Sequence, residues 1–67
     1  MNIVEVTKEA MSKGRGITRE SWLPNSMLLI PTNTIHCFIG ETSDGKLIGK
    51  WQPCADDIVA DDWIVYG

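Results

Sequence analysis

Apolar residues recur at helical intervals near the start of the chain, at Ile3, Val6, Ala10 and Met11. Asn2 directly precedes this pattern, and Glu5 follows Asn2 by three residues, which is the spacing of a capping box. Asn2 takes the place of the usual Ser or Thr. Gly14 follows the pattern, and glycine readily takes the left-handed conformation that ends a helix. The pattern therefore predicts a helix over residues 3–13.

Shorter runs of a different kind follow this helix. Residues 16–19 have the length of a short strand, and residues 21–26 contain Pro24 and Asn25, which favour a turn. Residues 27–30 form a continuous apolar run that is too short for a helix and is stopped by Pro31. We expect a strand here that is covered on both faces, either by its own chain or by a partner subunit.

The dipeptide Asp44-Gly45 lies between two strand-like runs and suits the type I′ turn of a β-hairpin. A two-residue loop sets Ser43 opposite Lys46, Gly40 opposite Gly49, and Phe38 opposite Trp51. Alternation then predicts an aromatic face and an aliphatic face. The first comprises His36, Phe38, Gly40, Leu47, Gly49 and Trp51, and the second Ile35, Cys37, Ile39, Ile48 and Lys50. The paired glycines would leave a gap for a partner's backbone or a flat ligand.

The last part of the chain predicts one more helix and one more strand. Residues 54–60 suffice for one or two helical turns, with Asp56 and Asp57 near the positive N-terminus of the helix dipole. Residues 63–66 form a final apolar strand. The expected fold is a single α+β domain over residues 1–67: an N-terminal helix packed on a mainly antiparallel sheet of four to five strands, with a short helix before the last strand.

The chain has only 67 residues, so a core built from one copy is small. Small domains usually compensate with disulfides, a metal or oligomerisation. Cys37 and Cys54 are the only cysteines and form no C-x-x-C motif, and no secretory signal peptide is evident, which favours free thiols in a reducing cytoplasm. With His36 they give too few ligands for structural zinc. We therefore expect no metal, no cofactor, and a homo-oligomer.

The formal net charge of -3 argues against a protein that binds DNA or RNA polymers, because such binding neutralises many phosphates with Lys and Arg. No apolar run is long enough to span a bilayer, so no membrane partner is expected. A small anion remains an acceptable ligand, since cations gather in the first part of the chain at Lys8, Lys13, Arg15 and Arg19.

Several residues are candidates for binding a small ligand, and each also has a plain structural explanation. Trp22, Trp51 and Trp63 either stack on nucleobases or pack in the core or between subunits. Arg19 either forms charge-assisted hydrogen bonds to a pyrophosphate or is a solvent-exposed residue at the end of a strand. The Asn25 amide either hydrogen-bonds a base edge or a ribose, or belongs to a residue that favours a turn. Gln52 either hydrogen-bonds a base edge or is simply exposed, and Asp57 either hydrogen-bonds a ribose or caps a helix. The last candidate is His36, on the predicted aromatic face.

Catalysis is not expected. His36 and Cys37 are adjacent, and neighbours along a strand point to opposite faces, so they cannot share a hydrogen bond there. A thiol nucleophile at Cys54 would need a base from elsewhere.

The segment from Trp51 to Trp63, WQPCADDIVADDW, resembles the C-terminal pattern G-W-x-P-S-Q-A-D-x-L-A-x-D-W of the phage anti-Thoeris sponge family. The matching positions are Trp51, Pro53, Asp57, Ala60, Asp62 and Trp63. Upstream, the helix, the basic Arg19 region, Trp22, Asn25 and the strand from Met27 follow the family order more loosely. The chain departs from the pattern at Lys50, where Gly is usual, at Cys54 for Ser, and at Ala55 for Gln.

This resemblance implies a phage protein that acts in the host cytoplasm as a homo-oligomer, often a tetramer, with a dimer as the other possible assembly. Such a protein sequesters small cyclic nucleotide signals of bacterial immunity without cleaving them. The signals are of the cyclic ADP-ribose type, and in some members cyclic oligonucleotides. An alternative is a small protein–protein interaction module that inhibits a host protein through an exposed aromatic face.

Overall fold

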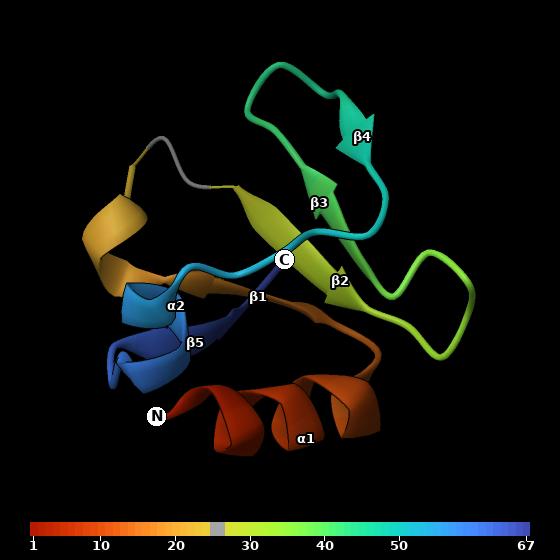
Figure 1. The fold of residues 1–67 in the computed structure, drawn as a ribbon. Helices are drawn as coiled ribbons and strands as arrows, with labels where there is room; N and C mark the ends of the chain where they lie inside the picture. Colours follow the sequence, from red (N-terminus) through yellow and green to blue (C-terminus); the bar gives the residue numbers. More distant parts are fainter. Residues whose placement is uncertain (25–26) are drawn as a thin grey trace.

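The fold is α+β, as expected from the sequence. The computed structural model describes residues 1–24 and 27–67. The elements in chain order are α1 (Ile3–Lys13), β1 (Gly16–Arg19), the 3₁₀ turn η1 (Glu20–Trp22), β2 (Leu28–Pro31), β3 (Phe38–Glu41), β4 (Leu47–Ile48), α2 (Ala55–Val59) and β5 (Trp63–Tyr66). The strands form one antiparallel sheet in the order β4-β3-β2-β1-β5 (Figure 1).

Helix α1 has the predicted bounds, and its ends explain them. The Asn2 side chain accepts a hydrogen bond from the Glu5 backbone N–H at 2.9 Å, and the Glu5 carboxylate accepts one from the Asn2 N–H at 3.2 Å. At the other end Gly14 takes a left-handed conformation with φ of 64°. Local residues therefore determine both ends of α1, independently of the sheet.

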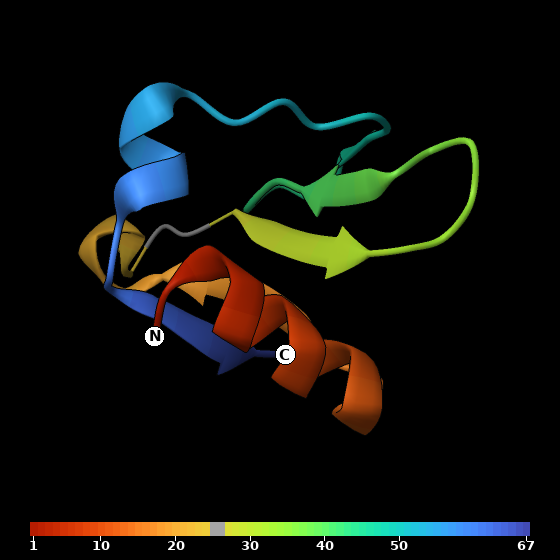
Figure 2. The same cartoon turned by 60° about the horizontal axis from the view of Figure 1, so that its bottom comes forward.

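The core lies between α1 and one face of the sheet. Five apolar residues are fully buried there: Val6, Ala10, Ile17, Leu29 and Trp63. The segment from Gly49 to Cys54 runs across the sheet between β4 and α2 (Figure 2), and brings Trp51 against the same core. Each fully buried large side chain stabilises the fold by roughly 1.5–3 kcal/mol. Four large side chains and Ala10 make a small core, as the length of the chain predicts.

The opposite face of the sheet carries a second apolar layer. Residues paired across strands share a face, and the register places Thr18 beside Ile64, Gly16 beside Tyr66, Leu28 beside Glu41, and Ile30 beside Ile39. We call the surface formed by Leu28, Ile30, Ile39, Glu41, Leu47, Ile64 and Tyr66 the open face. None of these residues belongs to the core cluster, and within the described part of the chain α1 and α2 both lie on the core side.

The register of the hairpin differs from the prediction by one residue. Glu41 pairs with Leu47 and Gly40 with Ile48, so Gly40 does not face Gly49. The loop has three residues rather than two: the Thr42 N–H donates to the Lys46 carbonyl at 2.9 Å, and Gly45 has φ of 88°. This is a turn closed by a left-handed glycine, which the same Asp-Gly dipeptide also suits. The shift moves Leu47 from the predicted aromatic face to the open face.

Two left-handed residues also interrupt the expected alternation: Cys37 has φ of 54° and Lys50 has φ of 55°. Phe38 and Trp51 are nevertheless neighbours as predicted, with ring centroids 6.2 Å apart and the Trp51 N–H donating to the Phe38 carbonyl at 2.9 Å. His36 does not join them. The predicted aromatic face is therefore wrong in its membership, because a turn before β3 and a distortion after β4 reverse the direction of the flanking side chains.

Smaller differences concern the central strand and the turn before it. Strand β2 begins and ends one residue later than predicted, and Pro31 is its last residue, paired with Phe38. Proline is tolerated there because it ends the strand. Ser21 and Trp22 lie in η1 rather than in an open turn. The predicted turn residues Asn25 and Ser26 lie outside the described residues.

Candidate functional site

Three tryptophans far apart in sequence meet on the core side of the sheet. The ring of Trp63 contacts Trp22 at a centroid distance of 5.5 Å and Trp51 at 6.3 Å, in both cases edge to face. We call these three residues the indole cluster. Trp63 is fully buried, and its ring N–H donates to the Asp57 carbonyl at 2.9 Å. Trp22 and Trp51 are half-buried. The cluster thus has a structural centre and two partly accessible outer rings.

Arg19 is held beside this cluster by two carboxylates. Its Nε donates to Asp62 Oδ1 at 2.9 Å and its Nη1 to Asp57 Oδ1 at 3.1 Å. The guanidinium carbon also lies 5.7 Å from the centroid of the Trp22 ring, within reach of a cation–π contact. Arg19 therefore ties the end of β1 to the start of β5 and to α2, and it supports Trp22.

Arg19 and Asp62 stabilise each other's charged forms. The hydrogen bond from Arg19, followed by bonds from Ser21, lowers the pKa of Asp62 to about 2. The Ser21 backbone N–H donates to Asp62 Oδ2 at 3.1 Å. Reciprocally, the hydrogen bond to Asp62 raises the pKa of Arg19. Arg19 contributes one positive charge and the two aspartates two negative charges, so the network carries a net charge of about -1.

Asp57 joins the network to the start of α2. Its Oδ2 accepts a hydrogen bond from the Cys54 backbone N–H at 2.9 Å, while Oδ1 accepts from Arg19. Both carboxylate oxygens thus have partners within the chain. This is the helix-cap explanation that the sequence offered for Asp57, and it makes a direct contact to a ribose less favourable.

The structure brings some of the predicted site residues together and separates others. Arg19, Trp22 and Asp57 meet in the network, and Trp51 joins them through Trp63. Gln52 follows Trp51 and is exposed. His36 lies elsewhere, in a hollow of about 230 Å³ that it lines with Ile39, Leu47 and Gly49. Asn25, the other predicted residue, falls in the part of the chain that the structure leaves undescribed.

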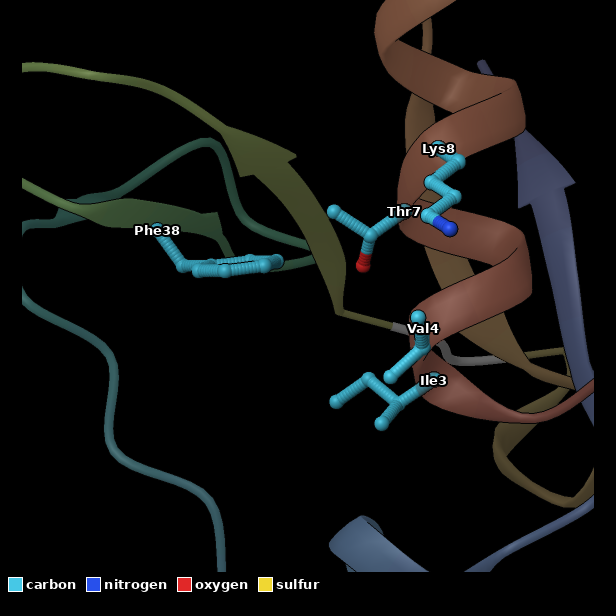
Figure 3. A pocket seen from close by; sticks show the side chains of 5 residues that line it. All are labelled: Ile3, Val4, Thr7, Lys8 and Phe38. Carbon is cyan, nitrogen blue, oxygen red and sulfur yellow. The ribbon is translucent and has the colours of Figure 1, made fainter.

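A second hollow was not predicted from the sequence. It has a volume of about 330 Å³ and lies between Phe38 and one side of α1 (Figure 3). Figure 3 shows the Phe38 ring facing Ile3, Val4 and Thr7 across the gap, with Lys8 beside them. The helical pairs Ile3–Thr7 and Val4–Lys8 are the sequence signal that was available, since residues four apart share a side of a helix. The hollow is largely apolar and lies apart from the charged network.

Residues 1–24 and 27–67 contain no group of three metal-ligating side chains, and Cys37 and Cys54 are exposed free thiols. His36 and Cys37 lie in a turn rather than in a strand, and the Cys37 N–H donates to the Thr34 carbonyl at 3.0 Å. The expectation that strand alternation directs the two side chains to opposite faces therefore does not apply. None of the helices described here has the length and apolar character needed to cross a membrane.

The fold and the cluster define a small α+β domain in which an internal ion network supports partly exposed indoles. Residues 1–66 match the Tad2-like family, described as the Thoeris anti-defense 2-like domain. The chain therefore belongs to this family, as the resemblance indicated, and its role is directed against the Thoeris defence system. Neither a curated protein nor a solved structure matches the chain at a significant level.

Proposed function

We propose that this protein is a sponge that binds small cyclic nucleotide immune signals and sequesters them without cleavage. The signals are of the cyclic ADP-ribose type or are cyclic oligonucleotides, and the protein acts as a homo-oligomer in the cytoplasm of the host cell. Membership of the anti-Thoeris family supports the anti-defence part of this proposal. The binding part is supported by the indole cluster.

The observation that carries the proposal is the pair of half-buried rings, Trp22 and Trp51, on either side of the buried Trp63. Stacking of a nucleobase on an aromatic ring contributes about 1–3 kcal/mol per base. Because Trp63 and Arg19 already hold these rings, little conformational entropy is lost when a ligand binds. The exposed amide of Gln52, next to Trp51, is suited to hydrogen-bond a base edge.

The ion network suggests a division of roles among the predicted residues. We assign Arg19 and Asp57 to positioning, because their charged groups already bond each other and Asp62. A phosphate is not expected beside a network that is negative overall. Lys50 is the better candidate for the phosphate, because it is exposed and precedes Trp51 directly. Ligand contact is then assigned to Trp22, Lys50, Trp51 and Gln52.

Titration calorimetry with cyclic ADP-ribose isomers and cyclic oligonucleotides tests this function. We expect heat of binding with at least one of them, and a weaker affinity for Gln52→Ala. Ser43→Ala is the control, because Ser43 is also exposed but lies in the hairpin turn. Chromatography of the ligand released by denaturation should return it unchanged. Folded protein that gives no heat with any of these ligands would remove the proposal, and a cleaved product would replace it with an enzyme.

A second candidate function is inhibition of a host protein by direct contact. Large apolar side chains exposed on the helices favour it: Val4 on α1 is 59% exposed, and Ile58 and Val59 on α2 are 49% and 79% exposed. Under this alternative, Val59→Lys abolishes inhibition of the defence system, and neither the wild type nor the variant gives heat of binding with the nucleotide ligands. Under the sponge proposal, Val59→Lys leaves the ligand affinity unchanged.

A further inference from the structure

The hollow between Phe38 and α1 follows from the width of a helix (Figure 3). A helix with its side chains is about 10–12 Å across, and neighbouring strands lie about 4.8 Å apart, so one helix covers about two to three strands. Helix α1 packs on β5, β1 and β2, which are neighbours in the sheet. Strand β3 is the next strand along, so its Phe38 side chain lies beside the helix rather than beneath it.

The walls of this hollow are held in place by the rest of the fold. The Phe38 ring contacts Trp51 with centroids 6.2 Å apart, and Phe38 and Ile3 both pack against the core cluster. Val4, by contrast, is 59% exposed, so the hollow has an open mouth. A fixed ring beside an open mouth favours stacking of a flat ligand, because little conformational entropy is lost when the ligand binds.

Two of the residues that line the hollow are polar, Thr7 and Lys8. Figure 3 shows the Thr7 hydroxyl oxygen on the side of the helix that faces the gap. Lys8 supplies a positive charge that its helical neighbours do not neutralise. The Glu5 carboxylate is used to cap the helix, and Glu9 pairs with Lys13 at 3.8 Å. One cation and one hydroxyl beside an apolar wall are suited to a ligand with a single anionic group.

The size and the lining of the hollow decide between classes of ligand. Small-molecule sites have volumes of about 300–1,000 Å³. The volume of about 330 Å³ is at the lower end of this range and suits one or two rings. A cyclic nucleotide would leave most of its phosphate and ribose oxygens without partners here. A neutral hydrocarbon would gain nothing from Lys8. The ligand that uses every lining group is an aromatic ring system with one carboxylate.

We propose that this hollow is a binding site for a small aromatic carboxylate, separate from the indole cluster. The ring system stacks on Phe38, and the carboxylate accepts hydrogen bonds from the Lys8 ammonium group and the Thr7 hydroxyl. The site is independent of the proposed function, because none of its lining residues is assigned to contact the nucleotide signal. A ligand of about a dozen non-hydrogen atoms should bind there with a dissociation constant on the order of 0.1–1 mM.

Titration of ¹⁵N-labelled protein with 1-naphthoate, followed by two-dimensional NMR, tests the site directly. We expect saturable shifts of backbone signals, centred on Val4, Thr7, Lys8 and Phe38. The compound 1-naphthalenemethanol has the same rings without the charge. It should bind at the same residues about two- to fivefold more weakly, which is the range that an exposed ion pair supports. Shifts that do not saturate, shifts that centre on Trp22, or equal affinities for the two compounds would overturn the proposal.

Three variants separate the contributions of the charge and the ring. Lys8→Gln should make the two compounds bind equally. Lys13→Gln is the matched control, because it removes the same charge from an exposed position of the same helix but does not line the hollow. Phe38→Leu should weaken both compounds alike, by about three- to tenfold, because it removes the ring face and leaves the charge. If circular dichroism shows Phe38→Leu unfolded, the two exposed lysine variants still decide the result.

Two results with these variants contradict the assigned contacts. If Lys13→Gln lowers the affinity for 1-naphthoate as much as Lys8→Gln does, the charge acts at long range and the assigned contact is wrong. If a folded Phe38→Leu binds both compounds as the wild type does, the stacking is wrong.

A second copy of the chain is the other occupant that the same spectra detect. Shifts of the Val4 and Lys8 signals on concentrating the protein alone, from about 0.05 to 1 mM, would show that another copy fills the hollow, and would overturn the proposal. Unchanged signals over this range leave the hollow open to the carboxylate. Because no nucleotide is present, a negative calorimetry result for the proposed function leaves this outcome unaffected.

Discussion

Trp63 is the residue whose loss should most clearly separate the structural role of the indole cluster from its binding role. Replacing Trp63 with Phe removes the ring N–H that donates to the Asp57 carbonyl at 2.9 Å, which costs about 1 kcal/mol for a partly buried bond. The smaller ring also leaves a cavity and weakens the contacts to Trp22 and Trp51 at 5.5 and 6.3 Å. These losses add about 1–2 kcal/mol.

The total of about 2–3 kcal/mol is large for this chain. At about 0.05–0.15 kcal/mol per residue, a chain of 67 residues has a free energy of unfolding of roughly 3–10 kcal/mol. Trp63→Phe should therefore remain folded with a melting temperature lower by roughly 10–20 °C. Trp63→Ala, at about 3–5 kcal/mol, should leave little or no folded protein.

Urea unfolding followed by far-UV circular dichroism measures this loss without relying on tryptophan fluorescence, which the substitutions change. All variants are compared at one protein concentration, because association adds to apparent stability. Trp22→Phe is the matched control: Trp22 is half-buried, so we expect a cost below about 1 kcal/mol together with a weaker ligand affinity. If Trp63→Phe costs less than about 0.5 kcal/mol, or no more than Trp22→Phe, the assignment of Trp63 as the structural centre is wrong.

Four further changes test the local structure. Lys50→Gly should raise the free energy of unfolding by about 0.5–1 kcal/mol in urea titrations, because Lys50 has φ of 55° and glycine takes this conformation without strain, while ligand affinity falls. Cys54→Ser should stabilise the protein by about 0.5–1 kcal/mol in thermal melts, because a hydroxyl caps α2 better than a thiol does, whereas Cys54→Ala should give no gain. Asp62 has a pKa of about 2 in the folded protein, below its ordinary value of 3.8, so its contribution to stability is present above pH 4 and is lost as the pH falls toward 2. The free energy of unfolding of Asp62→Asn should therefore vary less than that of the wild type between pH 4 and pH 2. Gly16→Ala should destabilise the fold and lower the melting temperature, since its Cβ would lie 2.4 Å from a methyl group of Leu28 and 2.9 Å from the Leu29 carbonyl oxygen.

The structure explains two departures of this chain from the family pattern, at Lys50 and at Cys54. Lys50 stands where the pattern has Gly, and its backbone is left-handed, which explains the preference for Gly. Cys54 stands where the pattern has Ser, and it is the residue that precedes α2, where Ser is a preferred cap. Both departures therefore affect stability first, and neither one changes the order of the elements.

Elements whose signals are local could be read from the sequence. The capping pair Asn2 and Glu5 with Gly14 gave the bounds of α1, and the aspartates before Ile58 indicated α2. The hairpin was found, but its register was not, because Asp44-Gly45 suits both a two-residue and a three-residue loop. A one-residue difference in the loop changes no local preference, yet it moves every outward side chain of β4 to the other face.

By itself, the sequence determined the fold class, the order and approximate positions of the helices and strands, and the family of this protein. Only the tertiary structure decided which candidate side chains have partners within the chain. Arg19 finds Asp57 and Asp62 at separations of 38 and 43 residues, and His36 is turned away from the indole cluster by a left-handed neighbour. The physical reason is range: caps and turns depend on residues a few positions apart, whereas ion pairs and ring contacts depend on how the sheet brings distant segments together.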